Sequence, residues 1–235
     1  MQSNRKHCKG RIQQQDLHCL SYNMHVYFKP GGILIYTSYI TFAMCDNLYE
    51  LSKYEPPAWA KDLAYIPQHR VRLGMFPTPI STWKNVPNLP KDIKLSVKRD
   101  DMTGSTLCGN KVRKLEFILG KALAEGYDAV ITCGGSCQSN HGRATAIAAR
   151  ELGLDCHMVV HSRSFNKDDI KHPANLMLDC FVGTKLHHIV QKTATFEYES
   201  VVKPKINEII SNLALAGTKT LCIPVGGSDT TGMFG

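Results

Sequence analysis

The feature that most constrains the fold of this chain is the alternation of short strand patterns with helical patterns between about residues 93 and 225. Five short segments have the composition or alternation of strands: 93–98, 129–133, 156–160, 185–190 and 221–225. Four segments between them predict helices: 112–123, 142–152, 173–180 and 203–216. Strands that alternate with helices at this spacing indicate βαβ units. We therefore expect an α/β fold with an open parallel sheet and flanking helices.

The size and charge of the chain exclude some classes of protein. With 235 residues, 43% of them hydrophobic, a compact fold would bury roughly 70% of its unfolded surface and needs no disulfide or metal. The net charge of +8 invites a nucleic-acid hypothesis. Beyond residue 11, however, the basic residues are scattered among acidic ones, and no aromatic residues alternate with them. We expect a basic globular surface and no nucleic-acid partner.

Cysteine usage and the first 50 residues bear on the location of the protein. The nine cysteines are an odd number without a CxxC pair, which indicates reduced thiols in an intracellular, cytoplasmic protein. Residues 1–45 hold five Lys or Arg and one acidic residue, so a mitochondrial transit peptide is the alternative. The apolar stretch 33–44 is shorter than the ~18 residues of a membrane span, so we expect no membrane partner.

The loop after strand 129–133 is the first candidate site. Its glycines allow close approach of the backbone to a ligand, and Ser139 and Asn140 supply short polar side chains at a helix start. The dipole of that helix favours a carboxylate or phosphate. Ser and Asn are also preferred N-cap residues, so the pattern supports a helix cap and a ligand site equally.

The loop 104–111 is the second candidate site. Its glycine spacing is like that of a P-loop, but Asn110 precedes the lysine and Val112 replaces the required Ser or Thr. Lys111 enters a helix N-terminus, where the positive end favours the neutral amine that a nucleophilic or Schiff-base lysine needs. The alternative is that Lys111, Arg113 and Lys114 form a solvated basic edge.

Other polar groups give no metal motif. His157 and His161 lie on a predicted strand, where their spacing is not that of a helical metal pair. Cys133 and Cys137 lack a second cysteine pair. Two further pairs, His187-His188 and Asp168-Asp169, are interpreted as surface or turn residues, and no metal site is expected.

Several ordered motifs resemble the D-cysteine desulfhydrase and 1-aminocyclopropane-1-carboxylate deaminase family, whose members are pyridoxal-phosphate enzymes of the tryptophan-synthase-β fold type (fold type II). The motifs occupy residues 76–80, 98–104, 109–117, 138–143 and 223–228. The resemblance covers about residues 70 to 235, and residues before about 50 have no counterpart. It implies a two-domain fold and pyridoxal 5'-phosphate as cofactor.

The resemblance also implies the roles of site residues. Lys111 would carry the cofactor as a Schiff base, Asn140 would hydrogen-bond the ring hydroxyl, and Lys114 would lie near the phosphate. Ser139 would be the second catalytic residue.

Substrate binding is implied for the loop residues Gln138, Ser139, Asn140 and His141, which would bind the substrate carboxylate or exchange protons with the substrate.

The resemblance further implies a domain organisation. Residues 1–50 would be an extension, expected to be poorly ordered; 58–113 and 223–235 would be parts of a large cofactor-binding domain, and 114–222 a small α/β domain. The rest of the large domain, with its glycine-rich phosphate cradle, is expected to be absent, so the chain resembles a C-terminally truncated member.

Three hypotheses about function follow. The first is a lyase that acts on a small amino acid and converts D-cysteine to pyruvate, ammonia and sulfide; the resemblance implies a homodimer for the full-length members of the family. The second is 1-aminocyclopropane-1-carboxylate deaminase-like activity. The third is a truncated, non-catalytic remnant that serves as a binding or dimer-interfering module.

Overall fold

The computed structural model describes residues 22–29, 32–39, 48–134, 138–162, 174–190 and 197–235. The chain divides into two compact units, Met1–Asp46 and Asn47–Gly235. In the first unit, β1 (Tyr22–Lys29) and β2 (Gly32–Tyr39) pair antiparallel, with Tyr22 opposite Tyr39. Among the described residues, no helix is long and apolar enough to cross a membrane.

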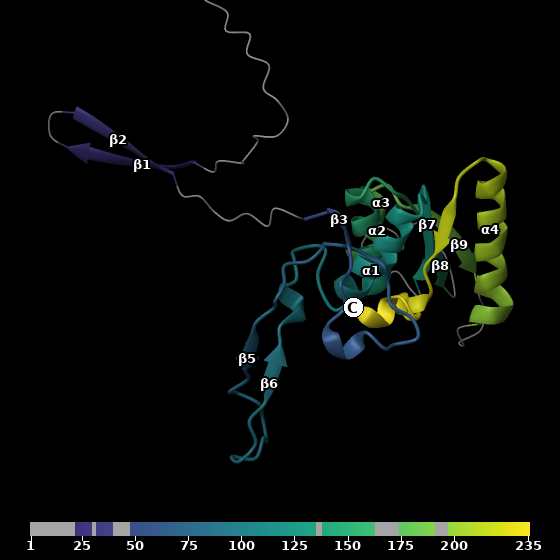
Figure 1. The fold of residues 1–235 in the computed structure, drawn as a ribbon, viewed down its shortest axis with the longest axis horizontal. Coiled ribbons are helices and arrows are strands. Elements are labelled where there is room, and N and C mark those ends of the chain that lie inside the picture. Colours follow the sequence, from purple (N-terminus) through teal and green to yellow (C-terminus); the bar gives the residue numbers. More distant parts are fainter. Residues whose placement is uncertain (1–21, 30–31, 40–47, 135–137, 163–173, 191–196) are drawn as a thin grey trace, which may run out of the picture. The chain divides into compact units, whose positions relative to one another are not determined.

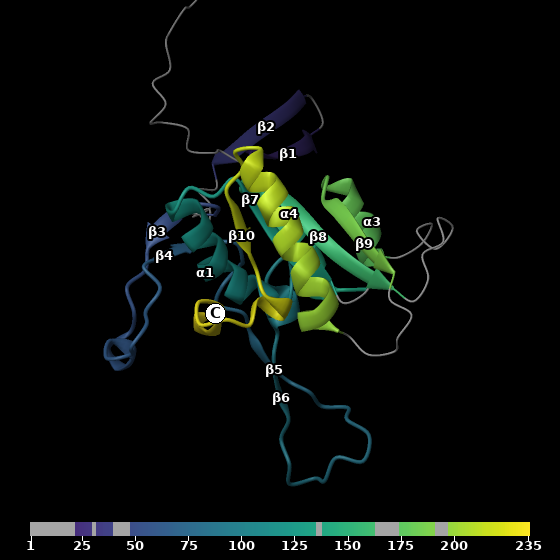
Figure 2. The same cartoon turned by 90° about the vertical axis from the view of Figure 1, so that its right-hand side faces the viewer.

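The centre of the second unit is a parallel sheet in the order β10-β7-β8-β9 (Figures 1 and 2). Its strands are β7 (Ala129–Gly134), β8 (Asp155–Ser162), β9 (Lys185–Val190) and β10 (Thr220–Cys222). In register, Ala129 lies beside both Thr220 and Asp155, and His157 lies beside Lys185. All neighbouring strands are parallel, which confirms the prediction of an α/β fold with an open parallel sheet.

The four predicted helices are present at nearly the predicted positions. They are α1 (Lys111–Ala124), α2 (Asn140–Glu151), α3 (Ala174–Phe181) and α4 (Lys203–Leu215). Gly126 and Gly153, two residues beyond the ends of α1 and α2, have φ values of 66° and 75°. Glycine adopts this left-handed conformation without the steric penalty of a Cβ, so these residues end the helices.

Helices cover both faces of the sheet. On one face, the apolar residues of α1, α2 and α3 pack on Val130, Met158 and Val160 in the larger core. On the other face, α4 packs its Ile206 and Ile209 against the sheet, as Figure 2 shows with α4 in front of the strands. Successive residues of a strand point to opposite faces. The continuous apolar runs that the sequence shows in β7 and β8 are therefore the result of burial on both faces.

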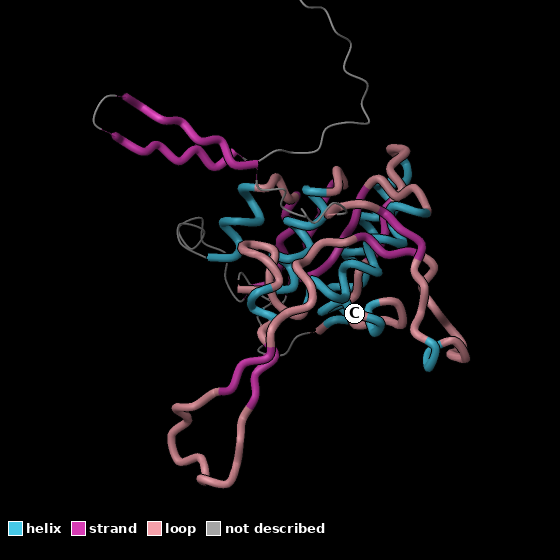
Figure 3. Tube along the Cα trace, turned by 60° about the vertical axis from the view of Figure 1, so that its left-hand side comes forward, coloured by secondary structure: helices cyan, strands magenta, loops and turns pink. Residues whose placement is uncertain are grey.

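Two short antiparallel pairs precede α1. They are β3 (Leu51–Lys53) with β4 (His69–Val71), and β5 (Ile80–Thr82) with β6 (Ser96–Lys98). The long loop 83–95 connects β5 to β6, and this hairpin projects from the rest of the second unit (Figure 3). Gly120 of α1 lies directly on the β4 backbone, because a Cβ there would come within 2.9 Å of the Cα of Arg70.

Two strands are shorter than predicted. The last strand, predicted at 221–225, ends at Cys222. The N–H of Ile223 still donates to the carbonyl of Ile131, but Pro224 has no N–H and ends the ladder. Strand 93–98 is confined to Ser96–Lys98, since only these residues pair with β5.

The interpretation of His187-His188 as surface or turn residues was wrong. Both lie within β9, and both side chains are half-buried. His187 Nε2 is 3.0 Å from Nδ1 of the buried His157, and the two rings stack with their centroids 5.2 Å apart. Pairing of the edge strand β9 with β8 brings His187 beside His157, which is 30 residues away in sequence. Asp168 and Asp169 lie outside the described residues.

Candidate active site

Lys111 is the first residue of α1 and is half-buried. The chain reaches it through Gly109, whose φ of 94° lies in the left-handed region. A Cβ at position 109 would meet no atom within 4 Å. The turn therefore requires glycine for its backbone conformation and not for space, and this turn sets the direction in which Lys111 begins the helix.

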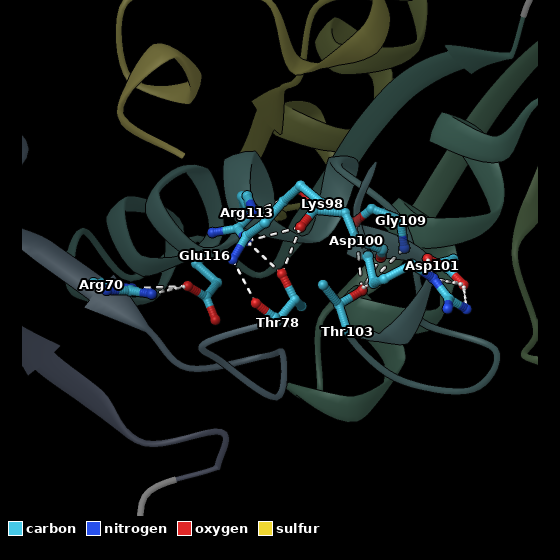
Figure 4. A network of polar contacts seen from close by, with 10 residues as sticks. Arg70, Thr78, Lys98, Asp100, Asp101, Thr103, Gly109, Arg113 and Glu116 are labelled. Carbon is cyan, nitrogen blue, oxygen red and sulfur yellow. Dashed lines mark hydrogen bonds and ion pairs between the residues drawn. The ribbon is translucent and has the colours of Figure 1, made fainter. Parts of the chain in front are cut away.

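A polar network fixes the segment that precedes Lys111 (Figure 4). Asp100 accepts hydrogen bonds from Nε and Nη2 of Arg113, both at 2.8 Å, and from the hydroxyl of Thr78 at 2.9 Å. The Arg113 guanidinium holds the pKa of the Asp100 carboxyl below its usual range. Thr103 accepts from the N–H of Gly109 at 3.0 Å. Because Arg113 belongs to the first turn of α1, the network ties this turn to the loop that leads into it.

The turn after β10 lies against the same end of α1. Nζ of Lys114 donates to Oγ of Ser228 at 3.1 Å. A Cβ on Gly226 would be 3.9 Å from Cε of Lys111. The two sequence motifs 109–117 and 223–228, more than 100 residues apart, therefore meet beside Lys111.

Ser139 is the N-cap of α2. Its Oγ accepts the N–H of Gly142 at 3.0 Å, so the helix-cap alternative is confirmed. The cap leaves the hydroxyl hydrogen of Ser139 available to an acceptor outside the helix. Gln138 and Asn140, on either side of Ser139, are exposed.

His141 is buried, and its hydrogen bonds define its tautomer. The Thr132 hydroxyl donates its hydrogen to the carbonyl of Ile223 at 2.9 Å. His141 Nε2 lies 2.9 Å from the same hydroxyl oxygen, so Nε2 must carry the hydrogen and donate it. Nδ1 then has a lone pair, and among the described residues it has no hydrogen-bond partner.

Burial, together with the positive charges of Lys111 and Lys114, lowers the pKa of His141 to about 4. The ordinary value is about 6.5. Between these values the unfolded chain binds a proton that the folded chain does not bind, so His141 makes stability fall as pH falls.

We expect His141→Gln to weaken this pH dependence, because the amide can still donate to Thr132 but does not titrate. Between pH 7 and pH 4.5 the parent should lose about 2 kcal/mol more stability than the variant. Urea unfolding at the two pH values measures the difference. Equal losses in the two proteins would contradict the assignment of a neutral, buried His141.

The structure brings the predicted site residues to one end of the sheet. Lys111 and Lys114 act electrostatically on His141, and Thr132 of β7 joins His141 to the chain just after β10. Helix N-termini at the carboxyl ends of parallel strands are the usual place for anionic ligands in such sheets. In the described part of the chain, no group of three or more His, Cys, Asp or Glu residues is arranged to hold a metal ion.

Sequence reasoning missed two residues that organise this site, Thr132 and Asn175. Thr132 is a polar residue inside an apolar strand, and Asn175 is a polar residue at the start of an apolar helix. Each breaks a hydrophobic pattern, which is the signal that could have indicated them. Their partners were not predictable, because Ile223 is 91 residues from Thr132 and Asn140 is 35 residues from Asn175.

A family model described as pyridoxal-phosphate dependent enzyme matches residues 71–233. The chain therefore belongs to the family of pyridoxal-phosphate dependent enzymes, which confirms the predicted family and, at the level of the family, the predicted cofactor.

Named relatives narrow the resemblance within that family. The chain is 42% identical over 195 residues to the bifunctional D-cysteine desulfhydrase/1-aminocyclopropane-1-carboxylate deaminase, mitochondrial, of Arabidopsis thaliana, covering 82% of this chain and 47% of the relative. It is 33% identical to a D-cysteine desulfhydrase of Klebsiella pneumoniae over 71% of this chain and 48% of that one. The chain thus spans about half the length of the curated relatives that it matches.

A solved structure agrees with these relatives. The crystal structure of an ACC deaminase homologue matches with a TM-score of 0.57 and 36% identity, over 69% of this chain and 46% of that chain. This match confirms the predicted fold type. The division of residues 58–235 into a large and a small domain stays a prediction.

Proposed function

We propose that this protein is a pyridoxal-phosphate-dependent lyase that acts on a small amino acid, with D-cysteine desulfhydrase as its main activity. The observation that carries the proposal is the position of Lys111 at the start of α1, where the turn that holds Gly226 and Ser228 lies against Lys111 and Lys114. Deaminase activity on 1-aminocyclopropane-1-carboxylate is the second candidate, since the Arabidopsis relative and the solved homologue carry that name.

The residues present fit the cofactor. Lys111 supplies an amine for its aldehyde, and Lys114 with the Ser228 hydroxyl supplies donors for its phosphate. The Nδ1 lone pair of His141, on a side chain only 7% exposed, has no partner among the described residues. Such a group costs free energy unless a ligand donor reaches it, which supports a ligand at this position.

The loop 138–141 would receive the substrate. Ser139 accepts a helix N–H with its oxygen and keeps its hydroxyl hydrogen to donate to a substrate carboxylate. The exposed Gln138 and Asn140 add amide donors. His141 Nδ1 is a neutral acceptor, so it can accept a proton or an N–H of the ligand but cannot donate to a carboxylate. Of the two predicted roles of His141, we therefore keep the exchange of protons and drop the binding of the substrate carboxylate.

When bound, the cofactor would act as an electron sink for the negative charge that remains at the α-carbon of the amino acid after its proton is removed, and this electron pair can expel a thiolate from the β-carbon. The side chains of this chain would then orient the substrate and move protons. For D-cysteine, with one water consumed, the products would be pyruvate, ammonia and sulfide.

The proposal is tested by reductive trapping. The protein is mixed with pyridoxal phosphate and treated with borohydride, and the modified peptide is identified by mass spectrometry. We expect the cofactor mass on the peptide that contains Lys111 and not on the peptide of Lys121, which lies on the same helix. Sulfide release from D- and L-cysteine and ammonia release from 1-aminocyclopropane-1-carboxylate then identify the substrate. Absence of trapping would overturn the proposal, and trapping without turnover would favour the binding-module hypothesis.

We also propose a homodimer in the cytoplasm, with the mitochondrion as the alternative that the name of the Arabidopsis relative supports. The expectation of reduced thiols in the cytoplasm is supported by two buried cysteines. Burial raises the pKa of the Cys133 thiol to about 11 and that of Cys156 to about 12, so both thiols stay protonated and unreactive. Light scattering of the purified protein tests the dimer, and imaging of the tagged protein tests the location.

A further inference from the structure

Asn175, the second residue of α3, contacts two residues of the candidate site, Gln138 and Asn140. Its buried side chain donates from Nδ2 to Oδ1 of Asn140 and to the backbone carbonyl of Gln138, both at 2.9 Å. Its Oδ1 accepts from Nη1 of Arg143 at 3.3 Å. One amide thus holds both neighbours of Ser139 and is itself held by a guanidinium.

The hydrogen bonds of Asn175 allow only one assignment of donors and acceptors. A guanidinium has donors and no acceptor, so the Asn175 atom that faces Arg143 must be oxygen. The –NH₂ group of Asn175 must then face Asn140, and because it can only donate, it must meet the Asn140 oxygen. The Asn140 –NH₂ group is left free to donate elsewhere. Arg143 therefore determines, through two amides, which end of the Asn140 side chain is available to a ligand.

The same guanidinium reaches the loop that precedes Lys111. Nη2 of Arg143 lies 3.6 Å from Sγ of Cys108, three residues before Lys111. The Arg143 side chain thus contacts both the amide that orients Asn140 and the loop that leads into α1. This shared contact favours a fixed geometry between Asn140 and the start of α1.

We propose that Asn175 is the positioning residue that turns the Asn140 amide so that its –NH₂ group faces the ring oxygen of the cofactor. The inference rests on the proposed function, in which Asn140 hydrogen-bonds that oxygen. Asn175 itself touches neither cofactor nor substrate; it acts on the cofactor through Asn140, and its bond to the Gln138 carbonyl fixes the orientation of its own amide.

Asn175→Asp is the most direct test, because the carboxylate has the shape of the amide and still accepts from Arg143 but cannot donate to Asn140. The Asn140 amide would turn its –NH₂ group to the new carboxylate and its oxygen to the site. We expect the affinity for pyridoxal phosphate, measured by fluorescence titration, to fall roughly tenfold, the change expected for the loss of one hydrogen bond.

The analogue 3-deoxypyridoxal phosphate separates this effect from simple charge repulsion. It keeps the phosphate and the aldehyde but lacks the ring oxygen, so it should bind the parent and Asn175→Asp equally well. Asn140→Ala should weaken pyridoxal phosphate binding, and adding Asn175→Asp to it should weaken binding no further. Asn207→Asp, an exposed site on α4, is the matched control and should bind as the parent does.

Amide hydrogen exchange of residues 138–142 in the cofactor-free protein adds a readout that needs no ligand. We expect faster exchange there in Asn175→Asp, with exchange in β7 and β8 unchanged if the variant is folded. Equal affinities of the parent and Asn175→Asp for pyridoxal phosphate would overturn this inference alone, as would equal weakening toward the analogue. No cofactor binding by the parent would overturn the proposed function and this inference with it.

Discussion

Glu116→Ala is expected to destabilise the second unit by about 3–5 kcal/mol, the largest effect on stability that we predict. The Glu116 carboxylate is fully buried in α1. One oxygen accepts from Nε and Nη2 of Arg70, the former at 2.8 Å. The other accepts the backbone N–H groups of Leu73 at 2.8 Å and Gly74 at 3.1 Å. Alanine would leave these donors without an acceptor, and Figure 4 shows the ion pair with Arg70.

Urea unfolding of the parent and the variants measures the change. Glu116→Gln should lose less, because its single oxygen can still accept from Leu73 and Gly74 while its –NH₂ group faces Arg70 unfavourably. Glu125→Ala is the control, at the exposed C-cap that directly follows the same helix, and it should change stability by less than about 0.5 kcal/mol. A Glu116→Ala protein as stable as this control would show that the buried carboxylate does not hold α1 to the 71–74 segment.

Lys111→Arg is expected to abolish covalent attachment of pyridoxal phosphate while leaving the fold intact. Arginine keeps the positive charge at the start of α1, but its guanidinium stays protonated and is not a nucleophile. The visible absorbance of the covalent adduct should disappear, and borohydride should leave no cofactor mass on the protein. Urea unfolding should be that of the parent, since Lys111 is only half-buried.

Lys121→Arg, on the same helix, is the control and should keep full trapping. Weak, dialysable binding of the cofactor to Lys111→Arg would agree with the proposal, because Lys114 and Ser228 remain. Trapping at unchanged yield in Lys111→Arg would assign the attachment to another amine and would sink the proposed role of Lys111.

Much of the fold was predictable because local patterns decide it. The apolar spacing in α1 and the glycine that follows it predicted this helix to within one residue at each end. Pro224 shows the limit of such reasoning: the apolar run 221–225 continues through it, but the missing N–H ends pairing with β7. His187 was misjudged because a polar residue on an edge strand resembles a turn residue until its partner His157 is known.

The candidate residues could be selected from the sequence, but their contacts could not, and their roles stay predictions. Lys111, Lys114, Ser139 and Asn140 follow from loop composition and from the resemblance. Sequence alone left Ser139 equally suited to a cap and to a ligand site, and only the bond from Gly142 showed that it is the cap.

The sequence by itself determined the α/β class, the order of strands and helices along the chain and the identity of the lysine at the start of α1. These depend on hydrophobic period, glycine and proline positions and short motifs, all of which act over a few residues. Only the tertiary structure decided the strand order β10-β7-β8-β9, the tautomer of His141 and the polarity of the Asn140 amide. Each of these is set by a partner tens of residues away, and a hydrogen bond acts only where folding has brought its two atoms within about 3 Å.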